Sequence, residues 1–249
     1  MLEVRSVCKR FGGLQAVSNA SITVPKGKIV SLIGPNGAGK TTLFALISGF
    51  LKPDDGEVKF MGREISGWKP HQVCRLGLVR TFQIVRPFAN LTVSENIAVA
   101  AHTWISKRSE AINKAAEIAG LTGMQDMLDQ PASALTISGR KRLELARALA
   151  TNPKLLLLDE VMAGLNTTEI FEIVEVVRRI RDSGVTILLI EHVMQAVMSL
   201  SDYSYVLNQG AMIADGIPRE VTRDPHVIEA YLGHGAAKRI AAMTEQEDA

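Results

Sequence analysis

Three closely spaced glycines lie near the N-terminus, and a lysine and two threonines follow them directly. The segment reads Gly34-Pro35-Asn36-Gly37-Ala38-Gly39-Lys40-Thr41-Thr42 and fits the pattern G-x-x-x-x-G-K-[ST]. Glycine has no Cβ, so this backbone can turn sharply and bring its N–H groups close to phosphate oxygens. The lysine supplies a charge for the β- and γ-phosphates, and the Thr41 hydroxyl can bind Mg²⁺. The segment therefore predicts a site for a nucleotide with Mg²⁺.

The flanking residues indicate how the chain holds this loop. Lys28–Ile33 is a short apolar run typical of a buried strand, and Thr42–Ser48 has helical spacing. A strand, the loop and a helix in this order place the phosphates at a helix N-terminus. We therefore expect an α/β protein whose core is a parallel, RecA-like sheet.

Bulk properties exclude several other classes of protein. A chain of 249 residues can bury a large core as one domain, and its net charge of +2 gives no electrostatic reason to expect a nucleic-acid partner. Cys8 and Cys74 have no metal-binding spacing, so reduced thiols in the cytosol are the default expectation. No apolar run approaches the ~20 residues of a membrane-spanning helix.

The periodicity divides the chain into a core and an insertion. Residues 1–87 contain short strand patterns at Leu2–Val7, Ala20–Val24, Ile29–Ile33 and Glu57–Phe60, and their alternation predicts an antiparallel β subdomain beside the core. Residues 88–151 change to helical spacing, with a capping box at Thr92–Glu95 and helices expected over Lys107–Ala119 and Gly139–Ala150. We therefore expect a helical subdomain inserted into one nucleotide-binding domain that spans 1–249.

Strand and helix patterns alternate again over 152–235. Lys154–Leu158, Val185–Ile190 and Tyr203–Leu207 read as buried strands, and Glu169–Arg181 as an amphipathic helix. We assign 1–87 and 152–235 to the nucleotide-binding core with its β subdomain. The polar residues 236–249 are expected to be a disordered tail.

Two acids follow the strand Leu155–Leu158 directly. The carboxyl end of a parallel strand is where ligands bind in open α/β sheets, so Asp159 could hold Mg²⁺ and Glu160 could orient or deprotonate water. The alternative is a solvated pair at a strand end. His192 follows the strand Val185–Ile190 in the same way and could contact the γ-phosphate or the attacking water, whereas an isolated histidine is more often structural.

Other candidates depend more on context. Gln83 ends the stretch Leu78–Gln83 where the core meets the insertion, and its amide could reach Mg²⁺ or water; the alternative is a surface glutamine. Phe11, before two glycines, could lay its ring on a base or simply belong to the core. The small residues of Leu135–Gly139 could present N–H groups to an anion, or form an N-cap before a basic helix.

These features occur together in the order and approximate spacing of ABC-type ATP-binding subunits, and the chain resembles that family from Leu2 to about Gly233. The resemblance implies that Phe11 stacks on adenine, that Gln83 senses the transmembrane partner and binds Mg²⁺, and that Thr136, Ser138 and Gly139 form the signature turn. It also implies a head-to-tail dimer in which each ATP lies between one subunit's phosphate loop and the other's signature.

A narrower resemblance points to the ATPase of branched-chain amino acid importers. It is carried by Lys9–Val17, Gly77–Gln83, Arg142–Arg147, Asp159–Asn166, Ile190–His192 and Val227–Gly233. This implies integral-membrane permease subunits, a second ATPase subunit that is a paralogue or a second copy, and indirectly an upstream solute-binding protein. The chain would then lie on the cytoplasmic, inner face of the plasma membrane through the permease. Importers of urea and short amides share much of the pattern.

Three features, at four positions, depart from the family pattern. Ile137 and Ser138 replace glycines of the usual Leu-Ser-Gly-Gly-Gln signature, Val161 replaces a common proline, and Asn166 replaces a frequent aspartate. In a heterodimer, the altered turn is expected to weaken the site on the partner's phosphate loop rather than the one built on Lys40.

Two other classes of protein remain as alternatives. A soluble ABC ATPase of DNA maintenance or translation usually has a long coiled-coil insertion or two cassettes, and this chain has neither. The other class is a P-loop kinase or GTPase. No guanine-recognition Asn-Lys-x-Asp sequence occurs, and the acidic pair followed by a strand and a histidine indicates hydrolysis. ATP hydrolysis that powers an importer is the function we expect.

Overall fold

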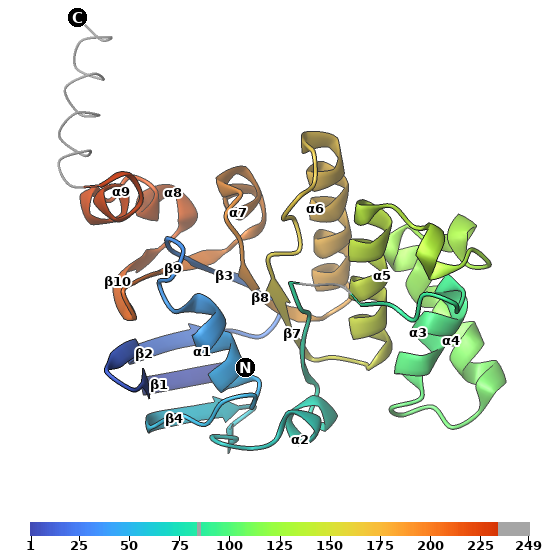
Figure 1. Cartoon of the computed structure of the whole chain (residues 1–249), viewed down its shortest axis with the longest axis horizontal. Helices are drawn as coiled ribbons and strands as arrows, with labels where there is room; N and C mark the ends of the chain where they lie inside the picture. The colour runs from blue at the N-terminus through green and yellow to red at the C-terminus, as the bar shows by residue number, and fades with distance from the viewer. Residues whose placement is uncertain (84–85, 234–249) are drawn as a thin grey trace, which may run out of the picture.

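Two β-sheets organise the molecule (Figure 1). The computed structural model describes residues 1–83 and 86–233. The predicted tail 236–249 lies outside these residues. Within the described part, no helix is long and apolar enough to cross a membrane.

The larger sheet has the strand order β10-β9-β3-β8-β7-β6. Its strands are β3 (Ile29–Ile33), β6 (Leu78–Arg80), β7 (Leu155–Asp159), β8 (Thr186–Ile190), β9 (Tyr203–Asn208) and β10 (Ala211–Gly216). All pairs are parallel except β9 with β10. The central strands β3, β7 and β8 are buried at every residue, as expected for apolar strands covered on both faces.

The smaller sheet is antiparallel, with the order β2-β1-β4-β5. It consists of β1 (Leu2–Phe11), β2 (Leu14–Val24), β4 (Asp55–Phe60) and β5 (Arg63–Glu64). The predicted strands Leu2–Val7 and Ala20–Val24 were too short. The β1–β2 pair contains register shifts, and Ser6 and Asn19 adopt positive φ angles of 49° and 50°. These irregularities interrupt the alternation on which the prediction relied.

The helices are α1 (Lys40–Ile47), α2 (Pro70–Arg75), α3 (Val93–Ala101), α4 (Arg108–Thr122), α5 (Ile137–Ala150), α6 (Thr167–Asp182), α7 (Met194–Leu200), α8 (Pro218–Val221) and α9 (Pro225–Leu232), with short 3₁₀ turns at Gln125–Met127 and Ala132–Ala134. Helices α3, α4 and α5 pack together at one end of the molecule (Figure 1). The capping box predicted at Thr92 is present and opens α3.

Helix α1 lies between the two sheets, and this position fixes the phosphate loop. Its fully buried Phe44 belongs to one apolar cluster with Leu32 of the larger sheet and Val58 of the smaller sheet. The predicted fold class, a P-loop core with an antiparallel β subdomain and a helical subdomain, is therefore confirmed. The exact division of the chain into these parts stays a prediction.

Candidate active site

The glycine-rich loop joins β3 to α1, and the chain's own backbone requires two of its glycines. A Cβ on Gly34 would lie 2.0 Å from the Leu207 carbonyl oxygen, and one on Gly39 would lie 2.3 Å from that of Ala16. Gly39 also has φ 104° and caps α1 without a side chain. No side chain therefore caps the first N–H groups of α1, which leaves them available to an anion.

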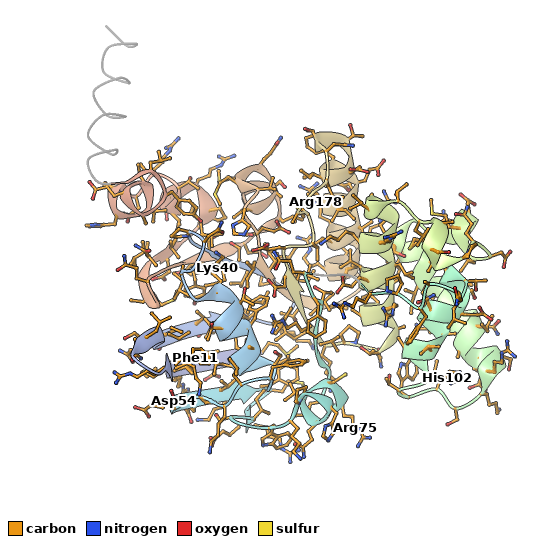
Figure 2. The ribbon with its side chains drawn as sticks, in the orientation of Figure 1. Phe11, Lys40, Asp54, Arg75, His102 and Arg178 are labelled. Carbon is orange, nitrogen blue, oxygen red and sulfur yellow. The ribbon has the colours of Figure 1, made fainter. Side chains whose placement is uncertain are left out.

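Lys40 is only 5% exposed and its ammonium group donates to the loop itself. Nζ lies 2.7 Å from the Gly34 carbonyl oxygen and 3.0 Å from that of Pro35. Burial lowers the pKa of Lys40, while the nearby carboxylates of Glu160 and Asp159 raise it. The lysine is thus held across the loop with two acids close by (Figure 2 shows it at the start of α1).

Glu160 lies where the predicted catalytic groups meet. It follows β7 directly and has φ 51°, a left-handed conformation that is unfavourable for a residue with a side chain. One carboxylate oxygen bonds Nε2 of His192 and the other accepts from Nε2 of Gln83. Backbone strain of this kind occurs at functional sites where the surrounding structure enforces it. Residues 83, 160 and 192, far apart in the sequence, therefore form one hydrogen-bonded group.

Asp159, the last residue of β7, has a different partner. Its Oδ2 lies 2.7 Å from Nη2 of Arg80, and both side chains are almost fully buried. Its backbone N–H donates to the Thr81 hydroxyl at 3.2 Å. The carboxylate therefore already has a cationic neighbour.

Two adjoining cavities are lined by these groups, except that His192 lines neither. One, of about 550 Å³, is lined by Phe11, residues 36–42 of the loop and Glu160, together with Leu14, Gln15, Ala16, Gln209 and Gly210. The second, of about 480 Å³, is lined by Thr41, Gln83 and Asp159 with Arg80, Phe82, Arg86, Glu144 and Arg147. Thr41 lines both cavities. Phe11 is 47% exposed, so its ring is accessible from the first cavity.

A larger cavity of about 630 Å³ lies elsewhere and includes none of the predicted site residues in its lining. It is bordered by Lys154 and Val185, which precede β7 and β8, and thus lies at the amino ends of these strands. Ligands of open α/β sheets bind at the carboxyl ends. The candidate site is therefore identified by its lining residues and its place at the carboxyl ends of the strands, not by the volume of the cavity.

The donor set of the second cavity suits a magnesium ion. Thr41, Gln83 and Asp159 bring a hydroxyl, an amide and a carboxylate, and hard cations prefer such oxygen ligands. Among the described residues no group of three or more His, Cys, Asp or Glu could hold a metal by itself. One carboxylate with substrate phosphates is the usual way in which Mg²⁺ binds.

The signature segment differs from its predicted form. Helix α5 begins at Ile137 rather than Gly139, because the Thr136 hydroxyl accepts the Gly139 N–H at 3.1 Å and acts as the N-cap. Ser138 is buried and Ile137 is 62% exposed. Thr136, Ser138 and Gly139 line neither of the two cavities described above. A single chain does not bring this segment to its own phosphate loop.

Sequence reasoning missed several buried charges around the site. Lys141 of α5 donates to the carbonyl oxygens of Gln83 and Glu160, at 3.3 and 3.2 Å. Glu144, one turn further on, accepts the Phe82 N–H at 2.5 Å, and burial raises its pKa. The sequence contained a signal for these buried charges, because Lys141 and Glu144 interrupt the otherwise apolar face of this helix.

Glu191 is the other missed acid. It is 1% exposed and accepts the Met162 N–H at 3.0 Å. Burial raises its pKa to about 7, with the Glu160 charge adding to the rise, although the Met162 and His192 N–H groups and Lys141 oppose it. Glu191 therefore ties the segment after Glu160 to the segment that carries His192.

Comparison with known proteins identifies the family. A model described as ABC transporter matches residues 17–163, more than half of the chain. The chain belongs to the ABC transporter family. It is accordingly an ATP-binding cassette with ATPase activity, and a second model, described as branched-chain amino acid ATP-binding cassette transporter, matches residues 211–237.

Individual relatives agree with this assignment. The chain is 43% identical to the high-affinity branched-chain amino acid transport ATP-binding protein LivG of Salmonella typhimurium, over 94% of this chain and 98% of the relative. It is 41% identical to the corresponding protein BraF of Pseudomonas aeruginosa, with the same coverage. A crystal structure of an ATP-binding cassette of an ABC transporter in its ADP conformation superposes with a TM-score of 0.88, at 35% identity over 94% of this chain and 99% of that one. The predicted family is thus confirmed.

Proposed function

We propose that this cassette hydrolyses Mg²⁺–ATP to drive the import of branched-chain amino acids. The observation that carries the catalytic part is the hydrogen-bonded group of Glu160, Gln83 and His192 beside the phosphate loop. The named activity of relatives with 41–43% identity supports this substrate class over urea or short amides.

The phosphate loop and Lys40 bind the phosphates, and Phe11 offers its ring to the adenine. Thr41, Gln83 and Asp159 would hold Mg²⁺, which would neutralise charge on the β- and γ-phosphates. Lys40 donates to loop carbonyls in this structure, so phosphate oxygens would replace Gly34 and Pro35 as its acceptors.

Glu160 orients and activates the attacking water, and His192 contacts the γ-phosphate. The φ of 51° fixes the start of the Glu160 side chain, and the Lys141 contact with its carbonyl oxygen holds its backbone. Gln83 and His192 share the two carboxylate oxygens. Each oxygen keeps a second lone pair, so the attacking water can bond Glu160 beside these two contacts.

The site also needs a second subunit. Thr136, Ser138 and Gly139 do not reach this chain's own phosphate loop, so they would face the nucleotide of a partner cassette in a head-to-tail dimer. The buried Ser138 and the side chain of Ile137 restrict backbone approach there. In a heterodimer the weaker site would be the one on the partner's loop. Permease subunits would hold the pair at the cytoplasmic face of the plasma membrane.

Reconstitution tests the transport function. The chain, co-purified with its integral-membrane partner and placed in proteoliposomes, is expected to drive ATP-dependent uptake of labelled leucine. Excess isoleucine or valine should compete, and urea should not. Competition by urea or acetamide alone would favour the amide importer, and failure to recover any membrane partner would contradict the transport function.

The asymmetry has its own test. Glu160→Gln in this chain should abolish hydrolysis at the intact site, and the equivalent change in a paralogous partner should cost less. Equal loss of ATPase activity from both changes would count against the asymmetry.

A further inference from the structure

The Arg80–Asp159 ion pair connects two neighbouring strands at the metal side of the cavity. β6 and β7 are parallel, and Arg80 is in register with Leu157. Asp159 lies two residues further along β7 and so projects from the same face of the sheet as Leu157. The long arginine side chain therefore reaches forward along that face to the Asp159 carboxylate, with 2.7 Å between Nη2 and Oδ2.

The surroundings fix this arginine in place. Its side chain is only 8% exposed, and its guanidinium lies 5.9 Å from the ring centroids of Phe44 and Phe50 and 5.5 Å from that of Phe82. Within the described part of the chain Nε is buried and has no hydrogen-bond partner. The aromatic rings hold the guanidinium away from solvent, so its hydrogen bond goes to the Asp159 carboxylate.

The same arginine lines the cavity of the predicted magnesium residues Thr41, Gln83 and Asp159. We infer that Arg80 is a resident counter-ion of Asp159, which positions this carboxylate for Mg²⁺ and lowers the affinity of the site for the metal. The inference rests on the proposed magnesium–nucleotide site.

The physical reason is competition between two cations for one buried acid. Without metal, the guanidinium neutralises a carboxylate that would be costly to bury unpaired. Asp159 would hold Mg²⁺ while still paired with the fixed positive charge of Arg80, and the two cations would repel each other. Metal release after hydrolysis would thereby be favoured, because Arg80 remains beside the carboxylate as its ion-pair partner.

The test measures the dissociation constant of ADP for the purified cassette, once in EDTA and once in excess Mg²⁺. We define the ratio as the constant in EDTA divided by the constant in Mg²⁺. It reports how much the metal strengthens ADP binding, and its measurement needs no catalysis. Arg80→Met removes the charge at similar length and should raise the ratio by about tenfold. Arg80→Lys keeps the charge and should leave the ratio within about twofold of the wild-type value.

A double-mutant cycle separates this role from a direct contact of Arg80 with phosphate. Asp159→Asn removes the shared acid, so adding Arg80→Met to it should change the ratio no further. Arg142→Met is the matched control, since it breaks the ion pair with Glu172 away from the two cavities and should not change the ratio. If Arg80→Met does not fold, Arg80→Gln is the second uncharged variant, with the same expected rise.

An unchanged or lower ratio in the uncharged variants would overturn the inference, and so would an equal rise in the Asp159→Asn background. A wild-type ratio of one would instead contradict the proposed magnesium site and, with it, the inference.

Discussion

Glu191 gives the protein a pH dependence of stability that one substitution should remove. The carboxyl is 1% exposed, and its pKa rises from 4.5 to about 7 in the folded chain. The folded state then binds more protons than the unfolded state between these two values. The contribution of Glu191 to the free energy of unfolding is therefore fully present below pH 4.5 and is lost as the pH rises to 7.

The size follows from the pKa difference. At ~1.4 kcal/mol for each pH unit, a rise from 4.5 to about 7 corresponds to about 3 kcal/mol of unfolding free energy. Glu191→Gln retains an amide oxygen that can accept the Met162 N–H and has no proton to lose. Relative to wild type, the variant should gain about 3 kcal/mol between pH 4.5 and pH 8.

Urea unfolding of the nucleotide-free protein, followed by circular dichroism over this pH range, measures the difference. Other titrating groups such as Glu144 cancel because both proteins contain them. Glu175→Gln is the matched control: this glutamate is exposed and pairs with Arg178, so the difference from wild type should stay within about 0.5 kcal/mol. If the difference in unfolding free energy between Glu191→Gln and wild type does not change with pH, the raised pKa of Glu191 is refuted.

Three further substitutions, two of them with a control variant, test the local structure by urea unfolding. Thr136→Ala removes the N-cap of α5 and should cost about 1 kcal/mol, with Thr136→Ser close to wild type; equal stability of all three proteins would contradict the cap. Gly39→Ala introduces a Cβ 2.3 Å from the Ala16 oxygen and should cost about 3 kcal/mol and weaken ADP binding, whereas Gly37→Ala, where nothing lies within 4 Å, should cost about 1 kcal/mol. A larger loss of stability for Gly37→Ala than for Gly39→Ala would contradict the close approach of Gly39 to the Ala16 oxygen. Phe44→Ala should cost about 3–5 kcal/mol because its ring is fully buried between the sheets, and a loss below about 1 kcal/mol would contradict that position.

The sequence predicted those features that local chemistry determines. Glycine spacing predicted the phosphate loop, and the capping residues at Thr92 predicted the start of α3. Asp159, Glu160 and His192 were recognisable because each lies at or just after the carboxyl end of a buried strand. Gln83 was open from its local context alone, and the structure places its amide on Glu160.

The sequence could not show which strands are neighbours. β6 and β7 are separated by three helices along the chain yet are adjacent in the sheet, so the Arg80–Asp159 pair depends on strand order rather than on pattern. The start of α5 was wrong for a different reason: Thr136 outcompetes the small residues after it as an N-cap, and Ile137 is accommodated at the first helical position.

The most direct test of the account is the ATP hydrolysis rate of the assembled transporter with a single change at Glu160. Glu160→Gln should lower the rate at this site by at least about a hundredfold while ATP still binds, because the general base is lost and the phosphate loop is intact. Glu175→Gln, on the exposed face of α6, should hydrolyse ATP at the wild-type rate. A Glu160→Gln rate within about twofold of wild type would contradict the assignment of Glu160 as the residue that activates water.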